Sequence, residues 1–118
     1  MSKLNRLAES DGPQIMYDPM MRQVIEDHLQ VIINDVGTTV ETIPPEIAHS
    51  CRGDFYAVLS KMGTPPHMRW VILRTNGYTS PTQYTDDRFT VLVPSSALID
   101  TIVNTHRVNQ TIAQNRNN

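Results

Sequence analysis

The sequence predicts one α+β domain, in which a central βααβ unit carries an additional N-terminal helix and a C-terminal helix. Three observations predict this class. Apolar residues recur at helical spacing over residues 19–36 and again after residue 96. Over residues 52–95, turn residues separate two short amphipathic segments from a final apolar run. That run, residues 89–93, has the β-branched content typical of a strand.

The N-terminal part of the chain predicts an arm, a helix and a strand. Residues 1–15 are polar and rich in turn formers, so we expect an extended arm that becomes ordered on a partner. Asp18 can accept hydrogen bonds from the free amides of a helix that begins at Pro19 and continues to about Val36. The β-branched residues 38–43 then predict a short strand, which the two following prolines interrupt.

Turn residues divide the central unit into its elements. Asp54 can cap a first helix that ends at Gly63, and Asn76-Gly77 supplies the left-handed end of a second helix. Pro94 closes the last strand. The expected elements are a strand over residues 47–51, a helix over 55–62, a second helix capped by Thr64 over 65–75, and a strand over 89–93.

The chain ends in a further helix. Ser95 or Ser96 can cap it, and its apolar residues continue to about Ile112. Its asparagine-rich end is expected to fray or to dock on another subunit. The chain then divides into an arm and helix (residues 1–45), the central unit (46–95) and a C-terminal helix with a tail (96–118).

Composition excludes several classes of function. A net charge of −2, from 10 basic and 12 acidic residues spread along the chain, leaves no basic stripe, so we expect no nucleic-acid ligand. Nowhere do about 18 consecutive apolar residues occur, so we expect no membrane span. The start of the chain lacks the apolar run of a signal peptide, and Cys51 is the single cysteine. Both observations fit a protein made and assembled inside a cell.

No pattern of residues points to catalysis or to a bound metal. The four histidines are far apart and form no metal-binding pair. Glu26-Asp27 and Asp86-Asp87 are adjacent acidic pairs, whose side chains would face apart on a helix. Cys51 has no activating partner in the sequence beyond the nearby His49, which argues against a nucleophile. We therefore expect no catalytic residue, metal, cofactor or small-molecule substrate.

The order of motifs in the central unit resembles the lysin-motif (LysM) family. In that family Gly-Asp precedes a helix, and a glycine separates this helix from a second one that contains asparagine. A proline-containing loop then leads to an apolar strand that ends in proline. Here Gly53-Asp54, Gly63, Asn76-Gly77, Ser80-Pro81 and Pro94 stand in that order. The resemblance implies a LysM-like βααβ core.

The chain is also similar to the LysM-like wedge subunits of contractile phage baseplates. The features they share are a preceding helix, the Trp70-Val71-Ile72 run within the second helix, and a trailing helix. This resemblance implies a non-enzymatic structural protein of the virion, located in the tail baseplate and assembled in the host cytoplasm. Its implied partners are other phage baseplate and tail proteins.

An assembly function favours apolar and aromatic side chains at a subunit interface. Those expected there are Met16, Tyr17, Met20, Met21, Trp70, Ile99 and Val103. Trp70 and the methionines equally suit the core of this chain.

The alternative is a LysM module that binds peptidoglycan or chitin. Its glycan groove would consist of Gly53, Asp54, Phe55, Tyr56, Tyr78, Ser80 and Pro81. Phe55 stands where that family usually has a hydroxyl residue, and Asp87-Arg88 replaces a Gly-Gln pair. Both departures favour the assembly function.

Overall fold

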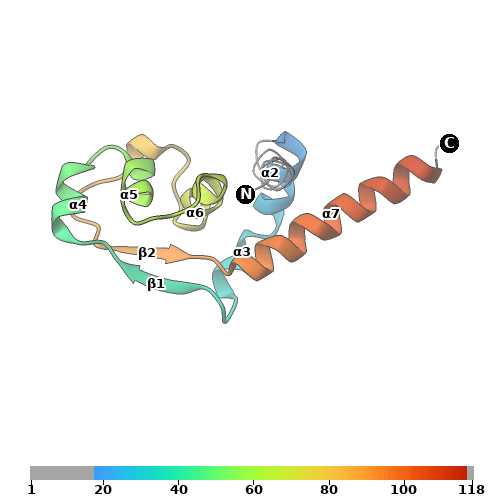
Figure 1. Ribbon diagram of the computed structural model, residues 1–118, viewed down its shortest axis with the longest axis horizontal. Helices are drawn as coiled ribbons and strands as arrows, with labels where there is room; N and C mark the ends of the chain where they lie inside the picture. Colours follow the sequence, from blue (N-terminus) through green and yellow to red (C-terminus); the bar gives the residue numbers. More distant parts are fainter. Residues whose placement is uncertain (1–17, 117–118) are drawn as a thin grey trace, which may run out of the picture.

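The protein combines short helices with a small antiparallel sheet (Figure 1). The computed structural model describes residues 18–116, with side chains up to Asn109 apart from Val108. In chain order its elements are α2 (Pro19–Asp27), α3 (Leu29–Asn34), β1 (Thr39–Thr42), α4 (Pro45–Ser50), α5 (Phe55–Lys61), the 3-10 turn η1 (Pro66–Met68), α6 (Arg69–Thr75), the 3-10 turn η2 (Pro81–Gln83), β2 (Thr90–Val93) and α7 (Ser96–Arg116). This mixture of helix and sheet agrees with the predicted α+β class.

β1 and β2 form a two-stranded antiparallel sheet. The register pairs Thr39 with Val93, Val40 with Leu92, Glu41 with Val91, and Thr42 with Thr90. Helices α5 and α6 lie on one side of this sheet (Figure 1), and Val91 is buried against that side. Because β1 precedes residue 45 and β2 follows it, the sheet joins both sides of the expected boundary between residues 45 and 46.

The expected strand over residues 47–51 is wrong, because this segment forms helix α4. Pro44 has an extended backbone with ψ of 139°, and Pro45 occupies the first helical turn, where its missing N–H costs nothing. The N–H groups of Ile47 and Ala48 both donate to the Pro44 carbonyl at 3.0 Å, which closes the first turn. The strand that pairs with β2 is instead β1, upstream of the prolines.

The single helix expected over residues 19–36 consists of two helices, α2 and α3. The break lies at His28, whose backbone angles are φ −107° and ψ 8°. Its N–H donates to the Ile25 carbonyl at 3.0 Å, as in a tightened last turn, and its Nδ1 lies 2.7 Å from the Val24 carbonyl. Ile25 and Ile32, one on each side of the break, are both fully buried, so both segments face the core.

Three of the expected helix caps are confirmed. At the start of α7 the Ser95 hydroxyl accepts a hydrogen bond from Leu98 N–H at 3.3 Å. The Asp18 carboxylate accepts a hydrogen bond from Met20 N–H at 3.0 Å. The Asp54 carboxylate accepts one from Ala57 N–H at 3.1 Å. Each satisfies an amide that the first helical turn leaves without a partner.

Three element boundaries differ from the prediction. The second central helix begins with the 3-10 turn η1, and Pro65 rather than Thr64 occupies the capping position. Val36 lies beyond the end of α3 and is fully exposed. Helix α7 reaches Arg116, past the expected end near Ile112.

One hydrophobic core joins the central unit to the flanking helices. Its buried members include Met21, Ile25 and Ile32 from α2 and α3, Phe55, Val58, Leu59, Val71, Ile72, Leu73, Tyr84 and Val91 from the central unit, and Ile99, Ile102 and Val103 from α7. Each large apolar side chain buried in this way stabilises the fold by about 1.5–3 kcal/mol. Among the α7 side chains that the structure describes, the buried ones belong to its N-terminal part.

Asn76 joins the end of α6 to the outer edge of β2. Its Nδ2 donates to the Leu92 carbonyl at 2.9 Å, and its Oδ1 accepts from the Leu92 N–H at 2.8 Å. Nδ2 also donates to the Ile72 carbonyl at 2.7 Å. The carboxamide therefore takes the place of a third strand. Gly77, with φ of +83°, then lets the chain turn away from the helix.

Replacing Asn76 tests this junction. Asn76→Ala is expected to lower the free energy of unfolding by about 2 kcal/mol, because the Leu92 N–H and carbonyl lose their partners beneath α6. Urea denaturation followed by circular dichroism measures the change. Asn104→Ala, on the exposed surface of α7, is the matched control and is expected to change stability by less than about 0.5 kcal/mol. Equal effects of the two substitutions would contradict the assignment.

Candidate assembly interface

Helices α2, α6 and the start of α7 lie close to one another near the middle of the molecule's long axis (Figure 1). Helix α2 packs against α7, and Met21 of α2 and Ile99 of α7 are buried. Trp70 of α6 is half-buried, and the Arg22 guanidinium of α2 lies 4.9 Å from its ring centroid, within cation–π range. This junction fixes the direction in which α7 leaves the body.

Arg74 connects α6 to α2 through a bidentate ion pair with Glu26. Its Nε donates to one carboxylate oxygen and its Nη2 donates to the other, the latter at 3.1 Å. Nη1 donates to the Tyr78 carbonyl, so the same side chain also holds the loop after α6. The hydrogen bond to Glu26 raises the pKa of Arg74 above its ordinary value, against the opposing effect of burial. The arginine's contribution is therefore present at neutral pH and is lost only as the pH rises through that elevated pKa.

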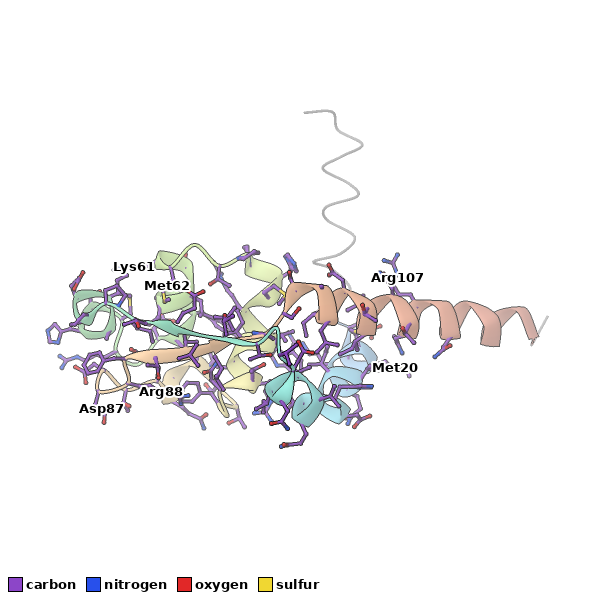
Figure 2. The ribbon with its side chains drawn as sticks, turned by 90° about the horizontal axis from the view of Figure 1, so that it is seen from below. Met20, Lys61, Met62, Asp87, Arg88 and Arg107 are labelled. Carbon is purple, nitrogen blue, oxygen red and sulfur yellow. The ribbon has the colours of Figure 1, made fainter. Side chains whose placement is uncertain are left out.

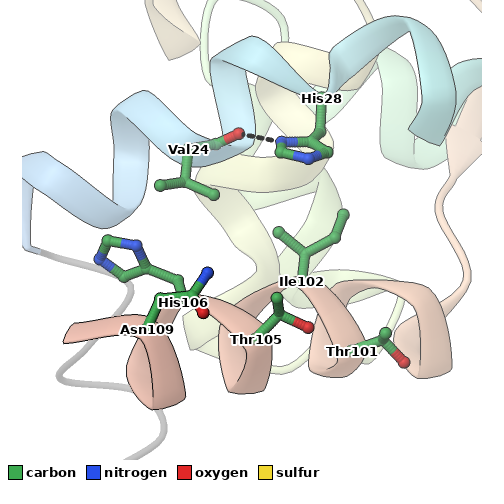
Figure 3. Close-up of a pocket in the computed structure, with 7 residues that line it drawn as sticks. All are labelled: Val24, His28, Thr101, Ile102, Thr105, His106 and Asn109. Carbon is green, nitrogen blue, oxygen red and sulfur yellow. Dashed lines mark hydrogen bonds between the residues drawn. The ribbon is translucent and has the colours of Figure 1, made fainter. Parts of the chain in front are cut away.

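Beyond the junction, α7 projects from the body of the protein (Figure 1, Figure 2). Among its described side chains, Val103 is the last buried one, whereas Asn104, Thr105, Arg107 and Asn109 are exposed. Figure 3 shows that α2 and α7 run antiparallel, because Val24 lies towards Asn109 and His28 lies towards Thr101. The C-terminal half of α7 thus extends past α2.

A cavity of about 340 Å³ lies between α2 and α7 (Figure 3). Its lining consists of Val24, His28, Thr101, Ile102, Thr105, His106 and Asn109. Two aliphatic side chains therefore alternate with hydroxyl, imidazole and amide groups. Within the described residues, His106 Nε2 is buried without a hydrogen-bond partner. Such a mixed surface suits protein side chains better than a purely apolar ligand.

A second cavity, of about 170 Å³, lies on the other flank of α7. Its lining consists of His67, Met68, Ile99, Asp100, Val103, Asn104 and Arg107. The α7 residues of the two cavities fall on opposite sides of the helix, because 3.6 residues make one turn. A cavity therefore lies on each side of α7 where the helix leaves the body of the protein.

The predicted interface residues divide into three groups. Met20 is 62% exposed on α2 and is available to a neighbouring molecule. Trp70 is half-buried, while Met21, Ile99 and Val103 are buried in the core of this chain, although the last two also line the second cavity. Met16, Tyr17 and the expected arm lie outside the described residues.

The two segments predicted for a glycan groove do lie side by side. The N–H of Gly53 donates to the Tyr84 carbonyl at 2.9 Å, which ties the start of α5 to the end of η2. The rings of Phe55 and Tyr78 pack edge to face, with centroids 5.0 Å apart. Phe55 is 1% exposed, so its ring serves the core and cannot stack on a sugar.

Polar groups in these segments are engaged within the chain. Asp54 caps α5, and the Ser80 hydroxyl caps η2 by accepting from Thr82 N–H at 3.3 Å. The Tyr78 hydroxyl lies 3.2 Å from an Arg88 Nη1 donor. Burial raises the pKa of Tyr84 above its ordinary value, and its hydroxyl donates to the Arg88 carbonyl at 2.9 Å. Tyr56 and Pro81 are half-buried beside these groups.

Among the described residues, no group of three or more His, Cys, Asp or Glu side chains is placed to hold a metal ion. Cys51 is a free, buried thiol. No helix in the described part of the chain is both long enough and apolar enough to cross a membrane.

Comparison with known proteins gave no match to a family profile, to a curated protein or to a solved structure.

The sequence did not predict the contacts that join α2, α6 and α7. The Arg74–Glu26 pair joins residues far apart in the chain, and no local pattern marks it. The cavity between α2 and α7 depends on the break at His28 and on helix direction, neither of which has a sequence signal. The exposed Met20, by contrast, belongs to a cluster of methionines that the sequence does mark.

Arg74→Lys tests whether this ion pair stabilises the α2–α6–α7 junction. Lysine cannot make two parallel bonds to Glu26 and a third to Tyr78, so a loss of about 1–2 kcal/mol in unfolding free energy is expected. Hydrogen exchange should also quicken in α2 before it does so in α5. Arg52→Lys, at an exposed position, is the control and should have little effect. A stability unchanged by Arg74→Lys would remove the pair from this role.

Proposed function

We propose that this chain is a non-enzymatic structural subunit that acts through protein–protein contacts. The observation that carries the proposal is the projection of α7 beyond the body, with a cavity on each flank where it leaves. On the resemblance of the sequence to LysM-like wedge subunits, its assembly is the wedge region of a contractile phage tail baseplate. Its partners are other baseplate and tail proteins, and its location is the virion.

The arrangement of the central unit supports the LysM-like part of the proposal. β1 and β2 enclose α5 and α6 in the chain, and Asn76 and Gly77 end the second helix as in the LysM pattern. Helix α4 is an addition between β1 and α5. In this interpretation the LysM-like core is a rigid block, and the flanking helices α2 and α7 make the functional contacts.

The projecting helix needs partners on physical grounds. Residues 110–116 add about 10 Å of helix beyond the last described side chain. In proteins, most of the stability of a helix comes from the packing of one face against other elements rather than from helix propensity. Neighbouring subunits that pack along α7 and fill its flanking cavities would supply the missing buried area. The exposed Met20 widens this contact surface on α2, because its flexible side chain adapts to different neighbours.

The glycan-binding function is the second candidate, supported by the proximity of the Gly53 and Tyr78 segments. The internal engagement of Asp54, Phe55 and Ser80 weighs against it. Sedimentation of the purified protein with peptidoglycan or chitin distinguishes the two functions. Retention of most of the protein in the pellet would overturn the assembly proposal.

Deleting residues 110–118 separates folding from assembly. Ile99, Ile102 and Val103, the buried residues among the described side chains of α7, remain, so the free energy of unfolding should change by less than about 1 kcal/mol. Co-purification with co-expressed baseplate proteins of the same phage should fall about tenfold or more, because the projecting contact surface is gone.

Arg52→Ala serves as the control for this deletion, since Arg52 is exposed in the central unit, close to the Gly53 segment. It should leave co-purification unchanged. If the deletion variant folds and still enters the complex at the level of the full chain, the role assigned to α7 is wrong.

A further inference from the structure

The two edges of the sheet differ in their hydrogen bonding. The outer edge of β2 is occupied at Leu92 by the Asn76 carboxamide. The outer edge of β1 has no hydrogen-bonding element beside it within residues 18–116. β1 lies at the lower margin of the molecule in Figure 1, and in Figure 2 the two strands face the viewer with no helix in front of them.

The register identifies the groups on the open edge. The Ile43 N–H donates to the Phe89 carbonyl at 2.7 Å, so residues 43 and 89 form a hydrogen-bonded pair. In an antiparallel sheet such pairs alternate with non-hydrogen-bonded ones, so the pairs 41–91 and 39–93 share this type. The N–H and carbonyl groups of Val40 and Thr42 therefore point away from β2, towards the open edge.

The side chains of β1 do not protect this edge. All four residues of the strand are exposed, and Val40 is 66% exposed. Folded proteins guard an open edge with short strands, charged side chains, proline or a bulge. β1 is short and carries Glu41, but Thr39-Val40-Glu41-Thr42 contains no lysine, proline or bulge. Glu41 is the single charge on the strand, and its backbone is paired with Val91.

We propose that β1 pairs antiparallel with β1 of a second copy of this chain, which extends the two-stranded sheet to four strands. An antiparallel edge is self-complementary, because each strand presents the same donors and acceptors to its two-fold mate. The new strand continues an existing sheet, and sheets of three or more strands are considerably more stable than an isolated pair. This inference is independent of the proposed function.

Charge selects the register of the pairing. If Val40 faced Thr42 of the second copy, the two Glu41 carboxylates would lie directly opposite each other, which is destabilising. If Val40 faces Val40 of the second copy, Glu41 faces Thr39 and the repulsion is relieved. Leu92 lies opposite Val40 on the same sheet face, so this register forms an apolar row of Leu92, two Val40 side chains and the second Leu92.

Single cysteines test the pairing and its register in the full chain, with Cys51→Ala removing the native thiol. Across a hydrogen-bonded pair the Cα atoms are about 5.5 Å apart, within the range of a disulfide. Val40→Cys should therefore form an intermolecular disulfide on mild oxidation. Thr42→Cys is the matched control, because four residues of stagger place its two copies about 13 Å apart. The disulfide-linked fraction should be about tenfold higher for Val40→Cys, measured by non-reducing gel electrophoresis.

Sedimentation equilibrium of the unmodified chain provides the second measurement. A reversible dimer that Val40→Lys weakens about tenfold or more supports the pairing, because this lysine places like charges opposite each other. Equal cross-linking at positions 40 and 42, or a monomer at all concentrations up to about 1 mM, overturns it. So does a monomer whose Val40 and Thr42 amides become protected only when another protein is added, since a different strand then occupies the edge.

Discussion

The pairing of the Asn76 carboxamide with the Leu92 peptide group is the constraint on which the rest of the structure depends. A two-stranded sheet alone is marginal, and a helix as short as α6 is marginal as well. The Asn76 side chain joins the two elements. It bonds to the Ile72 carbonyl at the end of α6 and to the N–H and carbonyl of Leu92 in β2. Arg88 also donates to the Asn76 carbonyl and to its Oδ1, both at 3.3 Å, which holds the carboxamide in place.

Helix α6 also contacts the flanking helix α2 through two side-chain interactions. Arg74 is the last but one residue of α6 and binds both Glu26 of α2 and the carbonyl of Tyr78. Trp70, one turn earlier, receives the Arg22 guanidinium from the same helix α2. Helix α2 in turn lies along the base of α7. Arg22 and Arg74 thus hold α2 against α6, and the packing of α2 on α7 sets the direction in which α7 projects.

The sequence predicted the elements whose signals are local. Asp18 and Asp54 cap helices because a carboxylate satisfies free amides whatever the tertiary fold, and Gly77 was readable from its left-handed turn. The segment 47–51 was too short for periodicity to distinguish a strand from a helix. It is helical because Pro44 is extended and Pro45 occupies the first helical turn. The break at His28 and the pairing of β1 with β2 have no local signal. In the candidate site, the exposure of Met20 fits the prediction, but Met21 is buried because the two residues lie on different faces of α2.

The hydrogen bonds from Asn76 to Leu92 also affect where further strands can join the sheet. A strand with two open edges can template an endless sheet, and such growth is the route to fibres. Here the outward-facing peptide group of Leu92 is occupied by Asn76 of the same molecule, so the β1 edge is the more available one for extension. A copy of this protein that joins at β1 presents its own β2 edge with Asn76 in the same place. Association through β1 then favours a pair of chains over an endlessly extended sheet.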